Sequence, residues 1–170
     1  MKERNHFDLE SRVGKAPGGY NYPLSVSIYP FIFMNAAGTH ADIVTFLHES
    51  GHAMHSFCIK NENIPLNIFR RYPIEIAEVA SMSMELMSMY GWDVFYKDKS
   101  DFQRAKEEQV NRILDIFPWV SIIDLFQLWL YKNPDHTVEE RRMKFKEILN
   151  EYEPWTDWSD YEQFKQVRWQ

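Results

Sequence analysis

The pentapeptide His48-Glu49-Ser50-Gly51-His52 limits the possible folds of this chain most strongly, because its two histidines can act together only on a helix. Residues four apart on a helix project from one face, about one turn from each other. Both imidazoles can then reach a single metal ion through ring nitrogens. Glu49 lies between them and is left free to take a proton from a water molecule that the metal activates. The motif therefore predicts a metal site with an adjacent base.

The residues around the motif support this helix. Residues 24–35 are rich in β-branched and aromatic residues and predict a strand that ends in a turn, with Pro30 indicating an edge strand or a bulge. Thr39 and Asp42 resemble a capping box, which places the motif two turns inside the helix. Gly51 costs about 1 kcal/mol of helix stability relative to alanine. A glycine at this position indicates that another segment packs closely against the backbone.

A hydrolytic zinc site needs a third protein ligand, and the next predicted helix offers candidates. This helix begins at Pro73, runs to about Tyr90, and carries Glu75, Glu78 and Glu85. Helical spacing puts the three carboxylates on one stripe, so geometry leaves the choice among them open. The apolar residues between them predict a mostly buried helix, in which carboxylates are rare unless they are paired or bind metal. We therefore expect at least one of the three to have a functional role.

Composition narrows the class of protein. A length of 170 residues with 45% hydrophobic residues suits one domain with a sizeable core, and a net charge of −6 argues against nucleic acid or an anionic membrane as partner. The N-terminal residues lack the apolar run of a signal peptide, and no stretch combines the length and freedom from charge of a membrane span. We expect a cytoplasmic protein.

The single cysteine, Cys58, is expected to be buried, off the ligand face of its helix.

The remainder of the chain predicts helices. A capping box at Ser100 begins a long helix that runs toward Tyr131 with an interruption at Pro118, and Thr137 with Glu140 begins the next. The expected fold is mainly α, with a short β-strand or hairpin near the N-terminus.

Several short motifs follow one another along nearly the whole chain, and their order is more specific than an isolated H-E-x-x-H. Together they resemble the oligoendopeptidase F and thimet oligopeptidase family of zinc metallopeptidases. The matching segments are Phe7-Asp8-Leu9, Gly18-Gly19-Tyr20, Pro30-Phe31, Gly38-Thr39, the pentapeptide at 48–52 and Ala77-Glu78-Val79-Ala80-Ser81.

This resemblance implies a zincin-like helical catalytic core and a role for each site residue. His48, His52 and Glu78 would be the ligands of a Zn²⁺ ion, and Glu49 would be the general base. Glu85 resembles the family's carboxylate that orients a ligand histidine. The implied activity is that of an endopeptidase, which hydrolyses internal bonds of short peptides without an organic cofactor.

The family pattern extends beyond both ends of this chain. It has a long helical region before the position of Met1, and a segment after the position of Gln170 that supplies a histidine and tyrosines for substrate binding and oxyanion stabilisation. Residues 1–170 are therefore expected to be a partial peptidase catalytic domain that cleaves peptides weakly or not at all by itself. The alternative, from a different functional class, is a non-catalytic helical fragment or interaction module that binds zinc or no metal.

Overall fold

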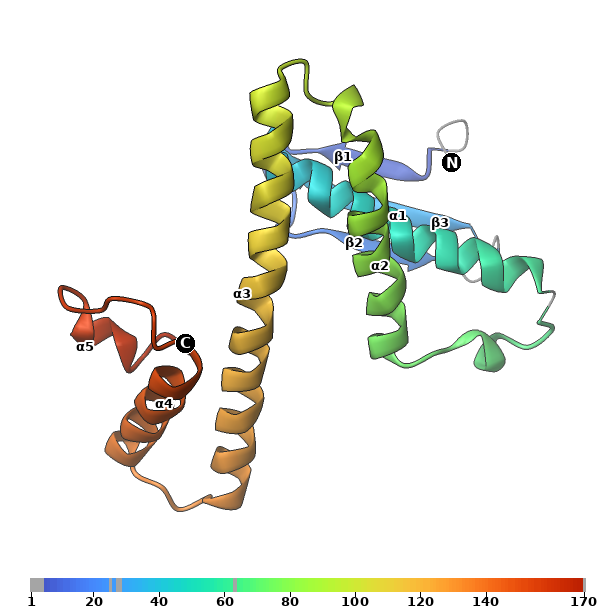
Figure 1. Cartoon of the computed structure of the whole chain (residues 1–170). Helices are drawn as coiled ribbons and strands as arrows, with labels where there is room; N and C mark the ends of the chain where they lie inside the picture. Colours follow the sequence, from blue (N-terminus) through green and yellow to red (C-terminus); the bar gives the residue numbers. More distant parts are fainter. Residues whose placement is uncertain (1–4, 25, 27–28, 63, 170) are drawn as a thin grey trace. The chain divides into compact units, whose positions relative to one another are not determined.

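The chain is mostly helical, with a small sheet near its N-terminus (Figure 1). The computed structural model describes residues 5–24, 26, 29–62 and 64–169. Within it the chain forms two compact units, residues 1–102 and residues 103–170. This distribution of elements confirms the expected fold class.

The sheet of the first unit has three strands in the order β1-β3-β2. Strand β1 (Phe7–Glu10) runs parallel to the central strand β3 (Pro30–Ala36), and β2 (Tyr20–Pro23) pairs antiparallel with β3. The sequence predicted only β3, within the strand expected over residues 24–35. It missed β1 and β2, because each has four residues and no clear alternation of apolar and polar residues. The expectation that Pro30 marks an edge strand or a bulge is wrong. Pro30 is the first residue of the central strand, a position that needs no ladder N–H.

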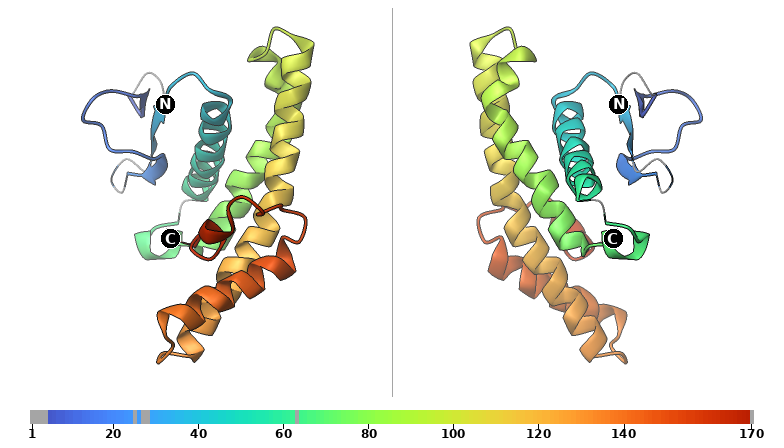
Figure 2. Two further views of the ribbon diagram at one scale, coloured as in Figure 1. Left: turned by 90° about the vertical axis from the view of Figure 1, so that its left-hand side faces the viewer. Right: turned by 90° about the vertical axis from the view of Figure 1, so that its right-hand side faces the viewer.

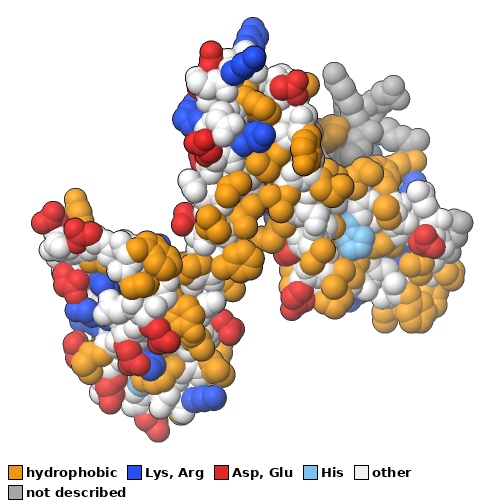
Figure 3. Space-filling view, in the orientation of Figure 1, with side chains coloured by type: hydrophobic (Ala, Val, Ile, Leu, Met, Phe, Trp, Pro, Cys, Tyr) orange, Lys and Arg blue, Asp and Glu red, His pale blue; other side chains and the backbone are white. Residues whose placement is uncertain are grey.

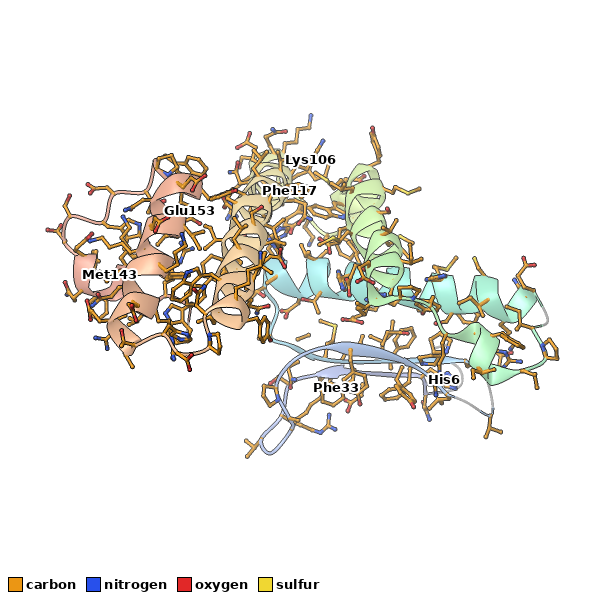
Figure 4. The ribbon with its side chains drawn as sticks, turned by 90° about the horizontal axis from the view of Figure 1, so that it is seen from below. His6, Phe33, Lys106, Phe117, Met143 and Glu153 are labelled. Carbon is orange, nitrogen blue, oxygen red and sulfur yellow. The ribbon has the colours of Figure 1, made fainter. Side chains whose placement is uncertain are left out.

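Helix α1 (His40–Asn61) lies against one face of this sheet, and α2 (Ile74–Ser88) packs on the opposite side of α1, so that α1 is the middle layer (Figure 2). Ile32 and Met34 of β3 are buried. Phe33, between them, points to the sheet face away from α1 (Figure 4), as the alternation of side chains along a strand requires. The buried residues of β3 thus join the sheet to α1, the helix that carries the histidine pair.

Helix α2 begins directly after Pro73, as predicted, and continues as the 3-10 helix η3 (Met89–Val94). A second 3-10 helix, η2 (Asn67–Arg70), precedes it. The prediction that α2 is mostly buried is wrong. Only Ala77 and Ser81 of α2 are buried, because the helix meets α1 along a narrow stripe of small residues. Six of its larger apolar side chains are exposed, and only Met84 is half-buried. The exposed six are Ile74, Ile76, Val79, Met82, Leu86 and Met87.

The second unit is a helical hairpin. Helix α3 (Lys99–Lys132) enters it from the first unit, and α4 (Val138–Tyr152) folds back against the second half of α3 (Figure 2), followed by the short α5 (Glu162–Lys165). The buried core of the hairpin consists of Ile122, Phe126, Phe145, Ile148 and Leu149, and four tryptophans, Trp119, Trp129, Trp158 and Trp169, pack against it.

The two predicted caps of these helices have different outcomes. At the start of α4 the box between Thr137 and Glu140 is present, with the Glu140 N–H 3.2 Å from the Thr137 hydroxyl. At the start of α3 the cap predicted at Ser100 is wrong. The Asp98 carboxylate instead accepts hydrogen bonds from the backbone N–H of Ser100 and Asp101. Aspartate two residues earlier competes successfully because it is itself a strong capping residue.

Within the described residues, α3 alone has the length and apolar composition that could cross a bilayer, with a mean hydropathy of 1.6 in its most apolar window. No such stretch was expected, because Asp115 and Asp124 interrupt the apolar run. A single helix of this kind is weak evidence for a membrane protein. Hydrophobic side chains gather along the middle of α3 on the face that Figure 3 displays. The exposed apolar residues of α3 include Leu114, Phe117 and Val120.

Candidate metal centre

The two histidines of the pentapeptide lie on one face of α1. The capping box at its start is present, since the Asp42 carboxylate accepts a hydrogen bond from the Thr39 N–H at 2.7 Å, and the motif begins two turns later as predicted. The ring centroids of His48 and His52 are 4.9 Å apart and the rings are nearly perpendicular, at 88°. The helix therefore presents two imidazoles side by side, as their spacing requires.

Glu78 of α2 faces this histidine pair. Its Oε2 lies 3.3 Å from His48 Nε2, and its Oε1 lies 3.8 Å from His52 Nε2. One ligand-capable atom from each of the three residues lies within 4.8 Å of the others. The side chains of His48, His52 and Glu78 are 24%, 15% and 37% exposed, so the cluster is open to solvent on one side. These residues could hold a metal ion and leave room for a further ligand.

The structure separates the three glutamates that helical spacing left equivalent. Glu85 lies with its Oε1 2.7 Å from His48 Nδ1, on the ring edge opposite to the one that faces Glu78. Glu75 is exposed and lies outside the cluster. A hydrogen bond at Nδ1 fixes the orientation of the His48 ring and directs Nε2 toward Glu78, a common arrangement around metal-binding histidines.

The close packing expected at Gly51 is confirmed, and it explains how α2 reaches the site. A Cβ atom added to Gly51 would lie 2.6 Å from the Cα of Ser81 and 2.7 Å from the carbonyl oxygen of Ala80. Any side chain at position 51 would therefore push α2 away from α1. Glu78 lies one turn before Ser81 on α2, so this contact sets the distance of its carboxylate from the two imidazoles.

Glu49 is buried, at 7% exposed, and is more enclosed than His48 and His52 on either side of it. Burial raises the pKa of its carboxyl group, while a hydrogen bond from the Asn21 backbone N–H works in the opposite direction. The Oε2 atom of Glu49 is buried and makes no hydrogen bond among the described residues. A carboxylate oxygen held without a partner beside two imidazoles suits a group that accepts a proton during a reaction.

Strand β2 contributes to the site in a way that the sequence interpretation missed. Besides the contact from Asn21, the backbone at Gly19 lies so close that an added Cβ would be 3.1 Å from Thr45 Cγ2 and 3.7 Å from Glu49 Oε1. The Gly18-Gly19-Tyr20 segment was singled out only through the family resemblance. Its glycines were the available signal that backbone approaches another group closely here.

The two histidines have opposite electrostatic settings. The hydrogen bond that His48 donates to the Glu85 carboxylate raises the pKa of His48, against the effect of burial. Burial, and then the charge of His48, lower the pKa of His52. Of the two rings, His48 therefore binds a proton more readily than His52.

Two further residues of α1 do not join the cluster. His55 packs against Tyr72 instead, with ring centroids 4.2 Å apart. Cys58 is exposed, so the expectation that it is buried is wrong. Ser56 is buried and Phe57 and Ile59 are half-buried, so Cys58 lies on the solvent-facing side of α1.

Known proteins resemble this chain along most of its length. The family description "Peptidase family M3" matches residues 1–168. The plasmid-encoded oligoendopeptidase F of Lactococcus lactis subsp. cremoris is 37% identical over 83 residues, which are 49% of this chain and 13% of that protein. The chromosomal oligoendopeptidase F of the same organism is 34% identical over 110 residues, or 65% of this chain and 17% of that protein.

Solved structures share the fold. PZ peptidase A with an inhibitor has a TM-score of 0.83 at 29% identity, and a putative oligoendopeptidase F from Bacillus anthracis str. Ames has a TM-score of 0.81 at 27% identity. Each match covers 98% of this chain and 29% of the solved chain. The chain thus spans less than a third of the length of these relatives.

Proposed function

The chain belongs to peptidase family M3, and on this premise we propose that it is the zinc-binding catalytic part of an endopeptidase that hydrolyses internal bonds of short peptides. The observation that carries the proposal is the convergence of His48, His52 and Glu78, whose ligand-capable atoms lie within 4.8 Å of one another beside a buried carboxylate. The names of the relatives, oligoendopeptidase F among them, support the substrate class.

Zinc is the proposed metal because of the donor set. Two imidazoles and one carboxylate form one of the usual ligand sets of catalytic zinc, and among the described residues no cysteine belongs to the cluster. The open side of the cluster leaves room for water and substrate. When bound, zinc would acidify a water molecule and polarise the peptide carbonyl.

In the proposed reaction Glu49 moves the proton. Its buried carboxylate, with Oε2 lacking a hydrogen-bond partner among the described residues, accepts a proton from the attacking water and passes it to the nitrogen of the departing amine. Burial, which raises the pKa of Glu49, brings its proton affinity closer to that of a base working near neutral pH. Glu85 orients the His48 ring through the 2.7 Å contact at Nδ1.

Metal content and cleavage test the two halves of this proposal. We expect one zinc per chain after purification and dialysis, lost in His48→Ala. Zinc-loaded chain is then incubated with an internally quenched short peptide, and we expect slow cleavage that disappears in Glu49→Gln while zinc stays bound. Absence of zinc contradicts the metal half, and cleavage that persists unchanged in Glu49→Gln contradicts the assignment of the base.

The alternative is a non-catalytic interaction module. The exposed apolar side chains of α2, including Val79, Met82 and Leu86, favour it, because contiguous apolar surface commonly marks contacts with other chains or segments. Under this alternative the chain binds zinc or no metal and never cleaves the peptide, with or without Glu49.

A further inference from the structure

Ser81 is completely buried, at 0% exposed, one turn after Glu78 on α2. Its hydroxyl lies 2.9 Å from the Oε2 atom of Glu78 and 3.1 Å from the Glu78 carbonyl oxygen. A helical serine ordinarily donates its one hydroxyl hydrogen to a carbonyl in the preceding turn. Here the closer acceptor is a carboxylate, which forms the stronger bond when it is ionised.

The same serine lies where the two helices touch. The Cα of Ser81 is the nearest neighbour of the position that a Cβ on Gly51 would occupy, at 2.6 Å. Gly51 is in turn adjacent along the chain to His52 and two residues from Glu49. The backbone of Ser81 is therefore held against the helix that carries the imidazoles. A hydrogen bond from its hydroxyl then restricts where the Glu78 carboxylate can lie.

We propose that Ser81 is a positioning residue, which holds the Glu78 carboxylate toward His48 and His52 through its hydroxyl while Gly51 allows the two backbones to meet. The inference rests on the proposed function, since it takes Glu78 to be a metal ligand. Without the hydroxyl, the Glu78 side chain regains rotamers that point away from the imidazoles, and metal binding has to restrict them again.

A merely structural role for Ser81 would have different consequences. If position 81 required only a small side chain at the helix crossing, alanine would serve as well as serine. Ser81→Ala removes one oxygen atom and keeps the Cβ, so it preserves the packing against Gly51 and deletes only the bond to Glu78. The variant thus separates the two roles.

The test is the zinc affinity of the full 170-residue chain, measured by competition with a chromophoric chelator. Since loss of an outer partner of a ligand typically costs 10–100-fold in metal affinity, we expect Ser81→Ala to bind zinc at least tenfold more weakly than the unaltered chain. The matched control is Ser83→Ala, an exposed serine on the same helix, which should change the affinity less than twofold. Urea unfolding of the metal-free proteins should give similar midpoints for both variants.

The same substitution is also made in a chain that lacks the Glu78 carboxylate, which gives a second test. In Glu78→Ala the hydroxyl has no carboxylate to hold, so adding Ser81→Ala should cause no further loss of zinc affinity. Equal affinities of Ser81→Ala and Ser83→Ala, or an additive loss in the Glu78→Ala background, would overturn the inference about Ser81. If instead the unaltered chain binds no zinc, or binds it as tightly without Glu78, the proposed function itself fails.

Discussion

Glu85 and His48, 37 residues apart in the sequence, meet at 2.7 Å between Oε1 and Nδ1 on the ring edge away from Glu78. This contact both directs the ring and favours its protonated form, so it has two measurable consequences. One concerns metal affinity and the other concerns proton affinity.

Replacement of Glu85 by glutamine should weaken zinc binding about 10–100-fold, because a neutral amide is a weaker acceptor than the carboxylate and gives the His48 ring less basicity and a looser orientation. Isothermal titration of the metal-free chain with zinc measures the change. Glu75→Gln makes the same chemical change at an exposed position of the same helix and should leave the affinity unaltered. An equal effect of both variants would show that the charge of α2, rather than the contact with His48, controls binding.

In the metal-free chain the two histidines should titrate apart, with His48 above and His52 below the ordinary value of about 6.5. The stability that the raised pKa of His48 contributes is fully present below about pH 6.5, and is lost as pH rises through the folded pKa. The lowered pKa of His52 has the opposite sign, since it opposes folding as pH falls below about 6.5.

Proton NMR of the imidazole resonances checks this order directly. Glu85→Gln should bring the pKa of His48 down and change that of His52 less, because the hydrogen bond to the Glu85 carboxylate is the main cause of the His48 shift and burial is the main cause of the His52 shift. A spectrum in which His52 gains its proton at a higher pH than His48 would contradict the electrostatic description of the site.

Gly51→Ala should destabilise the chain although alanine favours helix formation by about 1 kcal/mol. The new methyl group would lie 2.6 Å from a backbone atom of α2, and overpacking of this kind typically costs about 1–3 kcal/mol. We also expect weaker zinc binding, because α2 has to move away from the histidines. Gly91→Ala is the matched control, since an added Cβ there has no neighbour within 4 Å. Urea denaturation compares them, and an unchanged midpoint for Gly51→Ala would refute the close-contact account.

The side chain of Lys15 is buried on the sheet face away from α1 and makes hydrogen bonds there. Its ammonium group donates to the Glu10 carbonyl at 2.8 Å and to the Asp8 carboxylate at 3.0 Å, with the Phe33 ring 4.4 Å away. Lys15→Met should cost about 1–3 kcal/mol, because it leaves carbonyl groups without their donor. Arg12→Met removes the exposed partner of Asp8 and should cost much less. Thermal unfolding ranks the variants, and equal losses would contradict the role of burial.

Local sequence rules predicted the parts of the fold that depend on neighbouring residues. Thr39 with Asp42, and Thr137 with Glu140, are self-contained capping motifs, and the pairing of His48 with His52 follows from helical spacing alone. The mainly α class and the start of α2 follow for the same reason.

Contacts between distant segments were beyond such rules. Helical spacing could not distinguish Glu78 from Glu85, because the difference arises from how α2 crosses α1 at Gly51. The bond from the Asn21 backbone to Glu49 depends on a four-residue strand with no sequence pattern of its own. The exposure of α2 was also missed. The apolar composition of a helix shows that it could be buried, but it does not show whether another segment covers it.

X-ray absorption at the zinc edge of the loaded chain tests the central claim most directly, because it reports the donor atoms around the metal. We predict two imidazoles per zinc with oxygen completing the shell at about 2.0–2.2 Å and no sulfur, and loss of imidazole scattering in His48→Ala. A zinc–sulfur distance of about 2.3 Å, which would indicate Cys58, or a shell without imidazole would contradict the account.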